Sequence, residues 1–429
     1  MKCAKMRKAN RFRTKERRIL THTIRKWAVI IPISIITLAI AFIIISSILL
    51  SPTFVFRILT RWDASVEDYR FFPAATISAS TQPHVYEYNL DPALEHLPIT
   101  YRTAMGQEIT TNLADFVVST NSSSFIIVHN DIVIYEQYAN GSDRYSTNTS
   151  FSAAKSLVSL LIGRAIDDGY IDSHHQSIAD FIHEFRDTDM EQVTIRDLLL
   201  MRSGIYYEET GFLWFRHDAY TYWMPDLRQL ALDHRRLTDR HDGRFHYNNY
   251  NPLLLGIILE RSTGQSVSEY FEQAFWQPIG ANYDASWSLD SERTRFEKME
   301  SGFNFRSIDF IRMGSMLLND GHWNGQQIIS PEWIQMSTVL DFPINPNEYV
   351  GTFLESQNIG YGYMWYSKPS AAGGLDFFAL GRFGQILYVS PANHIVILRT
   401  GSTSGDTSGG GLGFSEVFAD IAVLIGSKD

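Results

Sequence analysis

The chain has 429 residues, of which 45% are hydrophobic and 13% aromatic, and this composition excludes an intrinsically disordered protein. The formal net charge is −10, but the first 27 residues contain eleven Lys or Arg and a single acid. The rest of the chain is therefore strongly acidic and offers no basic surface for nucleic acid.

Residues 28–50 carry no charge, are rich in Ile and Leu, and as a helix are long enough to cross a hydrocarbon layer of about 30 Å. Because a basic flank precedes them, the positive-inside rule places residues 1–27 in the cytoplasm and the chain after Ser51 in a periplasmic or other extracytoplasmic space. A cleaved signal peptide is the alternative, but the run exceeds the usual length of roughly 7–15 residues and no small-residue cleavage site follows it. We expect a single-pass signal anchor.

Residues 51–110 contain scattered prolines without a sustained hydrophobic period, so we expect a spacer with little regular structure that packs on or leads to the next domain. That domain is expected to occupy residues 111–429. Its first strands are predicted at Ser124–His129 and Ile132–Tyr138, because the Asn-Asp pair between them is typical of a tight hairpin turn. The single cysteine, Cys3, lies in the basic tail, so the domain is expected to fold without disulfides.

Apolar residues recur at helical spacing from Ser152 to Asp168, and Gly169 follows as a stop signal. Further helical patterns cover residues 194–201, 251–262, 267–275 and 307–319, with few strand signals between them. Strand patterns return at residues 376–379, 385–389 and 395–400, before a last helical stretch at 414–424. This order predicts an α+β fold: helices flank an antiparallel sheet built from both chain ends, a mostly helical subdomain is inserted, and one transmembrane helix precedes them.

Ser152 and Lys155 are the first candidates for chemistry. Residues three apart project from one face of a helix, so the Lys155 amine can lie within hydrogen-bond reach of the Ser152 hydroxyl. An S-x-x-K pattern is expected about once by chance in a chain of this length. The Y-x-N pattern at Tyr247 and Asn249 is equally weak alone, since another copy begins at Tyr138.

The surrounding blocks are more specific. They are FSAAKS at Phe151–Ser156, DLLLMRSG at Asp197–Gly204, FHYNNYN at Phe245–Asn251 followed by LLLG, and GHWNG at Gly321–Gly325. With these blocks in this order, residues 110–427 resemble the serine β-lactamase and penicillin-binding-protein superfamily. The resemblance is strongest to its class C β-lactamase-related branch of esterases and 6-aminohexanoate-dimer-hydrolase-like amidases. It implies a β-lactamase/transpeptidase-like fold.

The resemblance makes Ser152 the nucleophile, Lys155 its proton acceptor and Tyr247 the group that protonates the leaving atom. Whether Lys155 or Tyr247 is the acylation base stays open. Asn249 is expected to face the same site and to hydrogen-bond both Lys155 and the substrate carbonyl. Without the upstream serine, Tyr247 and Asn249 would be interpreted as a packing residue and a helix cap.

Members of the superfamily normally carry Lys-Thr-Gly or His-x-Gly on the strand beside the serine. The corresponding segment here is ALGRFGQ, and Ala379 replaces the cationic residue, so recognition of a substrate carboxylate is in doubt. Any residue offers a backbone amide, and we assign the oxyanion hole to the N–H groups of Ser152 and Arg382. The Arg382 guanidinium either points into the site and restores the charge or lies solvated on the turn.

Eight aromatic residues occur in the eighteen positions from Tyr206 to Trp223. Their interpretation as an apolar acyl pocket competes with core packing and with contact to a lipid interface. The candidate pocket residues are Trp214, Phe215, Tyr220, Tyr222 and Trp223. No H-E-x-x-H or comparable ligand spacing occurs, so we expect neither a metal nor another cofactor.

These predictions combine into a membrane-anchored, exported serine hydrolase that cleaves an ester or amide bond of a small molecule through an acyl-enzyme. Two alternatives stay open: a penicillin-binding D,D-peptidase, and a β-lactam-recognising sensor with little turnover. The expected partners are the substrate and the membrane, without nucleic acid, and the sequence sets no oligomeric state.

Overall fold

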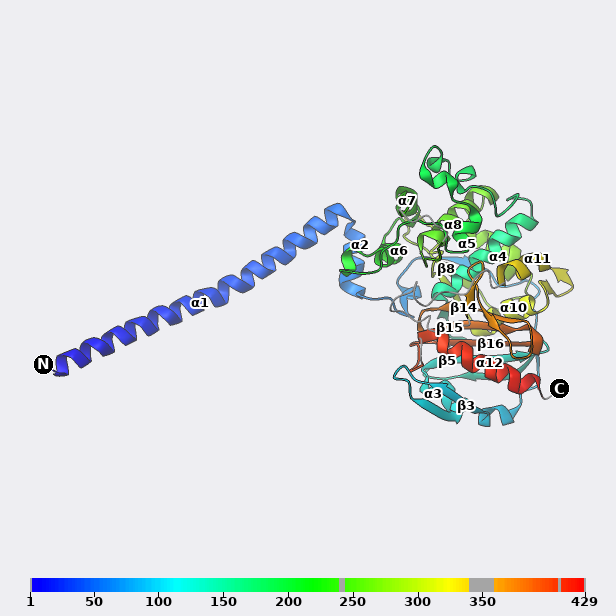
Figure 1. The fold of residues 1–429 in the computed structure, drawn as a ribbon, viewed down its shortest axis with the longest axis horizontal. Helices are drawn as coiled ribbons and strands as arrows, with labels where there is room; N and C mark the ends of the chain where they lie inside the picture. The colour runs from blue at the N-terminus through cyan, green and yellow to red at the C-terminus, as the bar shows by residue number, and fades with distance from the viewer. Residues whose placement is uncertain (1, 239–243, 339–358, 408–409, 428–429) are drawn as a thin grey trace. The chain divides into compact units, whose positions relative to one another are not determined.

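The computed structural model describes residues 2–238, 244–338, 359–407 and 410–427. The chain divides into two compact units, Met1–Asp63 and Ala64–Asp429. The first unit consists of α1 (Lys2–Leu49) and α2 (Pro52–Arg61), with Ser51 capping α2 through its side chain (Figure 1). Within α1, Lys26–Leu49 is long and apolar enough to cross a membrane. A signal sequence would have the same property.

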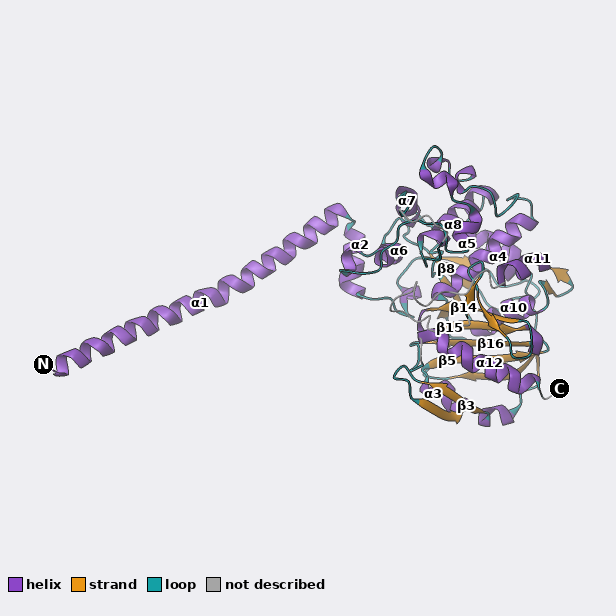
Figure 2. Ribbon diagram, viewed as in Figure 1, coloured by secondary structure: helices purple, strands orange, loops and turns teal. Residues whose placement is uncertain are grey.

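An antiparallel-rich sheet of eight strands forms the centre of the second unit (Figure 2). In spatial order its strands are β12 (Gly360–Tyr361), β13 (Tyr366–Pro369), β14 (Leu375–Gly381), β15 (Gln385–Ser390), β16 (Ile395–Gly401), β5 (Ser122–His129), β6 (Ile132–Tyr138) and β2 (Glu87–Tyr88). Only β2 pairs in parallel, at one edge. The predicted sheet from both chain ends is confirmed, since β16 from the C-terminal part pairs with β5 from the N-terminal part.

The predicted hairpin is also confirmed. Asn130 and Asp131 join β5 to β6 with φ values of 51° and 61°, the left-handed conformation of both central residues in a type I′ turn. Asn and Asp tolerate this conformation better than other residues with a Cβ, which is why the pair marks the turn in the sequence.

Helices cover both faces of the sheet. Gly314 of α10 (Ser307–Leu318) lies directly against the side chain of Val396, and Phe418 of α12 (Gly413–Gly426) packs edge-to-face on Tyr388. Tyr388 is opposite Ile397 in the ladder, and Ile397 and Val396 are neighbours in β16 that point to opposite faces. The core therefore lies between a helix layer on each side of one sheet.

The inserted region between β6 and β12 is mostly helical, as predicted, and Figure 2 shows α5, α6, α7 and α8 together, away from the sheet. The remaining helices are α3 (Leu113–Ser119), α4 (Ala154–Asp167), α5 (Ile195–Leu199), α6 (His217–Trp223), α7 (Leu227–Asp233), α8 (Tyr250–Thr263), α9 (Val267–Phe271) and α11 (Pro331–Thr338). The small strands are β1 (Ala74–Ile77), β3 (Pro98–Arg102), β4 (Glu108–Asn112), β7 (Asn148–Thr149), β8 (Ala285–Ser288), β9 (Phe303–Phe305), β10 (His322–Trp323) and β11 (Gln326–Gln327).

The expectation of little regular structure in residues 51–110 is wrong. This stretch contains α2, the strand β1, which pairs with β8, and the β3–β4 ladder. β3 alternates exposed and buried residues as a half-buried strand does, but it is only five residues long and begins at Pro98. Short strands that obtain their partners from distant segments leave little periodicity in the local sequence.

Candidate active site

Ser152 lies on a single 3-10 turn, Phe151–Ala153, that leads directly into α4. Phe151 has φ 45°, a left-handed conformation that costs a residue with a Cβ roughly 1–3 kcal/mol. The turn is anchored because the Ser150 amide donates to the Phe303 carbonyl at 2.8 Å. The backbone thus turns sharply just before the serine, and Ser152 remains partly exposed while its neighbours Phe151 and Ala153 are buried.

Lys155 lies one helical turn beyond the serine and is 1% exposed. Its Nζ donates to Ser152 Oγ at 3.0 Å and to the Glu300 carbonyl at 3.0 Å. The same Nζ lies 4.8 Å from the centroid of the Tyr247 ring. A hydroxyl within hydrogen-bond distance of a desolvated amine is the arrangement that activates a serine nucleophile.

Tyr247 and Asn249 lie on the segment that leads into α8. Asn249 Nδ2 donates to the Tyr207 hydroxyl at 2.9 Å and lies 3.3 Å from Thr221 Oγ1. Its buried Oδ1 has no hydrogen-bond partner among the described residues, so the expected contact with Lys155 is not formed. Asn249 occupies the N-cap position of α8, but its side chain makes no capping bond either.

The end of β14 lies beside the serine turn. A Cβ built on Gly381 would come within 3.0 Å of the Ser150 carbonyl oxygen and lie 3.2 Å from the Ala153 amide nitrogen. Only glycine therefore permits this approach between strand and turn. The next residue, Arg382, follows directly, so the two backbone segments assigned to the oxyanion hole are neighbours in the structure.

A buried arginine holds the turn that carries Arg382. Arg399 is fully buried, and its Nη1 donates to the carbonyls of Phe383 and Gly384, each at 2.7 Å. Phe383 has φ 64°, so the turn needs support to keep this left-handed conformation. The other donors of Arg399 bind Thr120, Thr403 and Ser122.

The charge at this end of β14 depends on Ala379, where the usual cation is absent, and on Arg382. Ala379 is 1% exposed within β14 and offers no charge. Arg382 is exposed, and its guanidinium lies 4.9 Å from the centroid of the Phe383 ring. Phe383 in turn packs edge-to-face on Phe151 of the serine turn at 5.3 Å.

The five aromatic residues predicted to form a pocket occupy different environments. Trp214 and Trp223 are buried, at 5% and 3% exposure, whereas Phe215 is 58% exposed. Tyr220 stacks on a histidine ring, and the Tyr222 hydroxyl donates to an aspartate at 2.8 Å. An acyl pocket lined by these residues stays a prediction.

Four residues in or near the site were not predicted. Glu300 supplies the carbonyl that accepts from the lysine, and its carboxylate forms a buried ion pair with Lys298 at 3.0 Å. Tyr207 holds the Asn249 amide. The pKa of the Glu209 carboxyl is raised, mainly by burial and secondly by the Asp218 carboxylate, while the charge of Lys155 acts in the opposite direction. The aromatic run pointed to Tyr207, but a Lys and two Glu residues in a charged sequence normally indicate a solvated surface.

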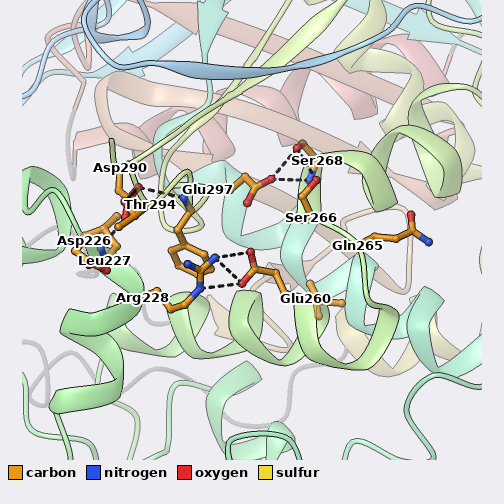
Figure 3. Close-up of polar contacts among 12 residues, drawn as sticks. Asp226, Leu227, Arg228, Glu260, Gln265, Ser266, Ser268, Asp290, Thr294 and Glu297 are labelled. Atoms are coloured by element: carbon orange, nitrogen blue, oxygen red, sulfur yellow. Dashed lines mark hydrogen bonds and ion pairs between the residues drawn. The ribbon is translucent and has the colours of Figure 1, made fainter. Parts of the chain in front are cut away.

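The loop that delivers residues 298–300 is fixed at two points, shown in Figure 3. Asp290 accepts from the Leu227 amide at the start of α7 at 2.9 Å. Glu297, which is 1% exposed, accepts from the amide and hydroxyl of Ser268 in α9, at 3.0 and 2.7 Å. The carbonyl that binds the lysine is therefore carried by a segment anchored to two helices.

Across the described residues no group of three or more His, Cys, Asp or Glu is arranged to hold a metal ion.

A comparison with protein families decides the affiliation, because the model of the family described as Beta-lactamase matches residues 111–410. The chain belongs to the beta-lactamase family. A 6-aminohexanoate-dimer hydrolase from Paenarthrobacter ureafaciens is 24% identical over 323 residues, which cover 73% of this chain and 80% of that protein. The family and this relative make the chain a serine hydrolase, in agreement with the resemblance found in the sequence.

Solved structures show the same fold. A putative 6-aminohexanoate-dimer hydrolase from Bacillus anthracis has a TM-score of 0.73 at 23% identity, covering 86% of this chain and 95% of that one. An octameric penicillin-binding protein homologue from Pyrococcus abyssi has a TM-score of 0.54 at 17% identity, covering 73% and 75%. The β-lactamase/transpeptidase-like fold is thereby confirmed for the second unit.

Proposed function

We propose that this beta-lactamase-family protein is a membrane-anchored, exported hydrolase that cleaves esters or amides through an acyl-enzyme on Ser152. The observation that carries the proposal is the 3.0 Å hydrogen bond between Lys155 Nζ and Ser152 Oγ at the start of a buried helix. In the first step Ser152 Oγ attacks the substrate carbonyl carbon and its proton passes to the Lys155–Tyr247 pair. The amides of Ser152 and Arg382 stabilise the negative charge on the carbonyl oxygen.

The tetrahedral intermediate then collapses. The bond to the leaving oxygen or nitrogen breaks, and Tyr247 returns the proton to that atom. Water then attacks the carbonyl carbon of the acyl-enzyme and gives a proton to the Lys155–Tyr247 pair. The bond to Ser152 Oγ breaks, the proton returns to that oxygen, and the acid leaves. Each proton removed in one half-reaction is returned in the same half-reaction, so both half-reactions balance.

The charges around Ser152 favour substrates without an obligatory carboxylate. Ala379 replaces the usual cation on β14, and Glu209 is close enough to Lys155 for the two charges to interact. At an effective dielectric constant of about 20, two carboxylates in one protein site repel each other by about 1–2 kcal/mol at separations on the order of 8–15 Å. The relative named 6-aminohexanoate-dimer hydrolase supports an amide as one candidate substrate class.

A panel of probes tests the chemistry. The detergent-solubilised full chain would be exposed to a fluorophosphonate, a fluorescent penicillin, and matched acyl esters and amides, with Ser152→Ala as the control. We expect labelling by the fluorophosphonate and turnover of neutral esters or amides, all lost in Ser152→Ala. Labelling that persists in the control rejects the serine assignment. Fast labelling by penicillin with slow release would instead favour the D,D-peptidase or sensor.

The substrate class has its own test in a matched ester pair, one neutral and one ending in a carboxylate. We expect kcat/KM to be about tenfold higher for the neutral ester, from the repulsion estimated above. Glu209→Gln should raise kcat/KM for the anionic ester and leave the neutral one nearly unchanged. An unchanged ratio in Glu209→Gln would show that this carboxyl does not select the substrate.

The anchor is tested by fractionation and topology. The uncleaved chain should remain in the membrane after alkaline extraction and keep its N-terminal residues, and added protease should reach the second unit in spheroplasts but not residues 1–27. Release of a shortened protein into the soluble exported fraction would show that the apolar run is a signal peptide.

A further inference from the structure

A series of buried polar contacts connects Lys155 to residues outside the proposed reaction. The Glu300 carbonyl accepts from Lys155, and the Glu300 carboxylate pairs with Lys298 at 3.0 Å, both side chains being 2% exposed. Lys298 Nζ also donates to the Tyr222 carbonyl at 2.7 Å, and it lies 4.2 Å from the centroid of the Tyr222 ring. The lysine of the site and Lys298 are thus joined through one residue.

These contacts continue into the segment Ser65–Phe72, which lies near the start of the second unit and follows the proposed anchor in the sequence. The Tyr222 hydroxyl donates to Asp68 Oδ2 at 2.8 Å, and the Ser65 amide donates to the same oxygen at 2.9 Å. Phe72 stacks on Trp223 with ring centroids 5.8 Å apart, and Lys298 Nζ lies 4.6 Å from the Phe72 centroid. Aromatic packing and hydrogen bonds together fix this segment on α6.

Asp68 is costly to bury, which argues that its position matters. It is 2% exposed, and its Oδ1 has no hydrogen-bond partner in the described parts of the chain. Glu300 Oε2 is likewise buried without a partner. Buried unpaired carboxylate oxygens are rare in folded proteins because each loses its hydration, so they call for a structural or functional reason.

We propose that Asp68 is a positioning residue for the acylation step. It holds the Tyr222 hydroxyl and thereby the end of α6, whose carbonyl at Tyr222 orients Lys298. Lys298 orients Glu300, and the Glu300 carbonyl fixes the Lys155 amine opposite the serine. The inference rests on the proposed function, since it assigns to residues outside the reaction the task of placing its base.

The test uses the full chain in detergent and compares kcat with KM on one neutral chromogenic ester. Asp68→Ala and Tyr222→Phe each remove one partner of the 2.8 Å bond, and we expect kcat to fall about 10- to 100-fold, the effect of misplacing a reacting group by up to about 1 Å. KM should change little, because Asp68 is not among the predicted pocket residues and Tyr222→Phe keeps the aromatic ring that the predicted pocket would use. Asp68→Asn keeps an oxygen that accepts from the tyrosine and should retain most of kcat.

Two comparisons separate this role from a general loss of stability. Glu67→Ala alters the neighbouring residue, whose side chain is 55% exposed and pairs with Arg70, and should leave kcat unchanged. The double variant Asp68→Ala/Tyr222→Phe should be no slower than the worse single variant, because both changes break the same contact. Tyr222→Phe keeps the packed ring, so it tests the contact even if Asp68→Ala does not fold.

The result that overturns the proposal is a folded Tyr222→Phe or Asp68→Ala protein with an unchanged kcat, or a double variant whose losses multiply. A rise in KM at constant kcat would also overturn it, since Asp68 would then act on binding. The Ser152→Ala control keeps the two proposals apart. Turnover that survives in Ser152→Ala rejects the proposed function, whereas loss in Ser152→Ala with full activity in Tyr222→Phe rejects only the role of Asp68.

Discussion

Gly381→Ala adds one methyl group between the strand end and the serine turn and changes no side chain assigned to the chemistry. The φ of Gly381 is −122°, an extended conformation that alanine adopts without strain, so space is the only obstacle. The added Cβ would come within 3.0 Å of the Ser150 carbonyl oxygen and lie 3.2 Å from the Ala153 amide nitrogen and from Phe151 Cβ.

The expected effect follows from these distances. Non-bonded heavy atoms normally lie about 3.5 Å apart, so β14 and the serine turn must separate by about 1 Å or more. A displacement of about 1 Å between a nucleophile and its oxyanion donors costs about 100-fold in rate. Overpacking of this kind lowers the free energy of unfolding by about 1–3 kcal/mol. The rate loss corresponds to about 2.7 kcal/mol in the activation barrier, so it should be measurable in a protein that is still folded.

The assay combines kcat/KM on a neutral chromogenic ester, the rate of fluorophosphonate labelling, and urea unfolding. Gly426→Ala is the matched control, because its Cβ would meet Asn393 Oδ1 at 2.7 Å. Asn393 follows the last residue of β15, whereas Gln385, the partner of Gly381, is the first residue of that strand, so the control lies at the other end of β15. We expect Gly426→Ala to lose stability and keep activity. Full activity and normal labelling in Gly381→Ala would refute the placement of the Arg382 amide beside Ser152.

Three further results are expected. Arg399→Met leaves the carbonyls of Phe383 and Gly384 unpaired and should lower the free energy of unfolding by roughly 3–5 kcal/mol in urea titration, with Arg399→Lys intermediate. A negligible loss in Arg399→Met would contradict the role of the guanidinium in holding this turn. Lys298→Met leaves Glu300 buried without its counter-charge and should lower the free energy of unfolding by about 3–5 kcal/mol. Adding Glu300→Gln should restore part of that stability, whereas a double variant whose loss equals the sum of the two single losses would contradict the pairing. Burial lowers the pKa of His234 to about 4, below its ordinary value near 6.5, so the folded state binds fewer protons between these values and stability should decrease as pH falls from about 6.5 to 4. His234→Gln should flatten that dependence in urea titrations at several pH values, and an unchanged slope would exclude His234 as its source.

The parts of the fold that local sequence determines were predicted correctly. The β5–β6 hairpin follows from two residues that tolerate left-handed φ, and the helix after Ser152 follows from apolar spacing and a terminal glycine. The proximity of Ser152 and Lys155 needs nothing beyond helical geometry. Each of these features is set within one turn or one element.

The features that depend on distant partners were not predictable. The Asn249 amide turns toward Tyr207, because that hydroxyl lies buried within reach, and no spacing pattern records this. The Lys298–Glu300 pair occurs in the sequence KMES, whose charges suggest a solvated loop, and only the anchoring of the loop by Asp290 and Glu297 buries it. Residues 74–112 form strands whose partners are remote or whose length is too short for a detectable period.

The contacts of the cations near Ser152 support the proposed preference for substrates without a carboxylate. Lys155 donates to Ser152 and to the Glu300 carbonyl, and Lys298 is paired with the Glu300 carboxylate. Arg382 is exposed, and its guanidinium lies over the Phe383 ring. A substrate carboxylate would have to draw Arg382 from that ring while the Glu209 carboxyl opposed it, whereas a neutral acyl group requires only the two backbone amides of the proposed oxyanion hole. These charges therefore support the proposal that neutral esters and amides acylate the serine.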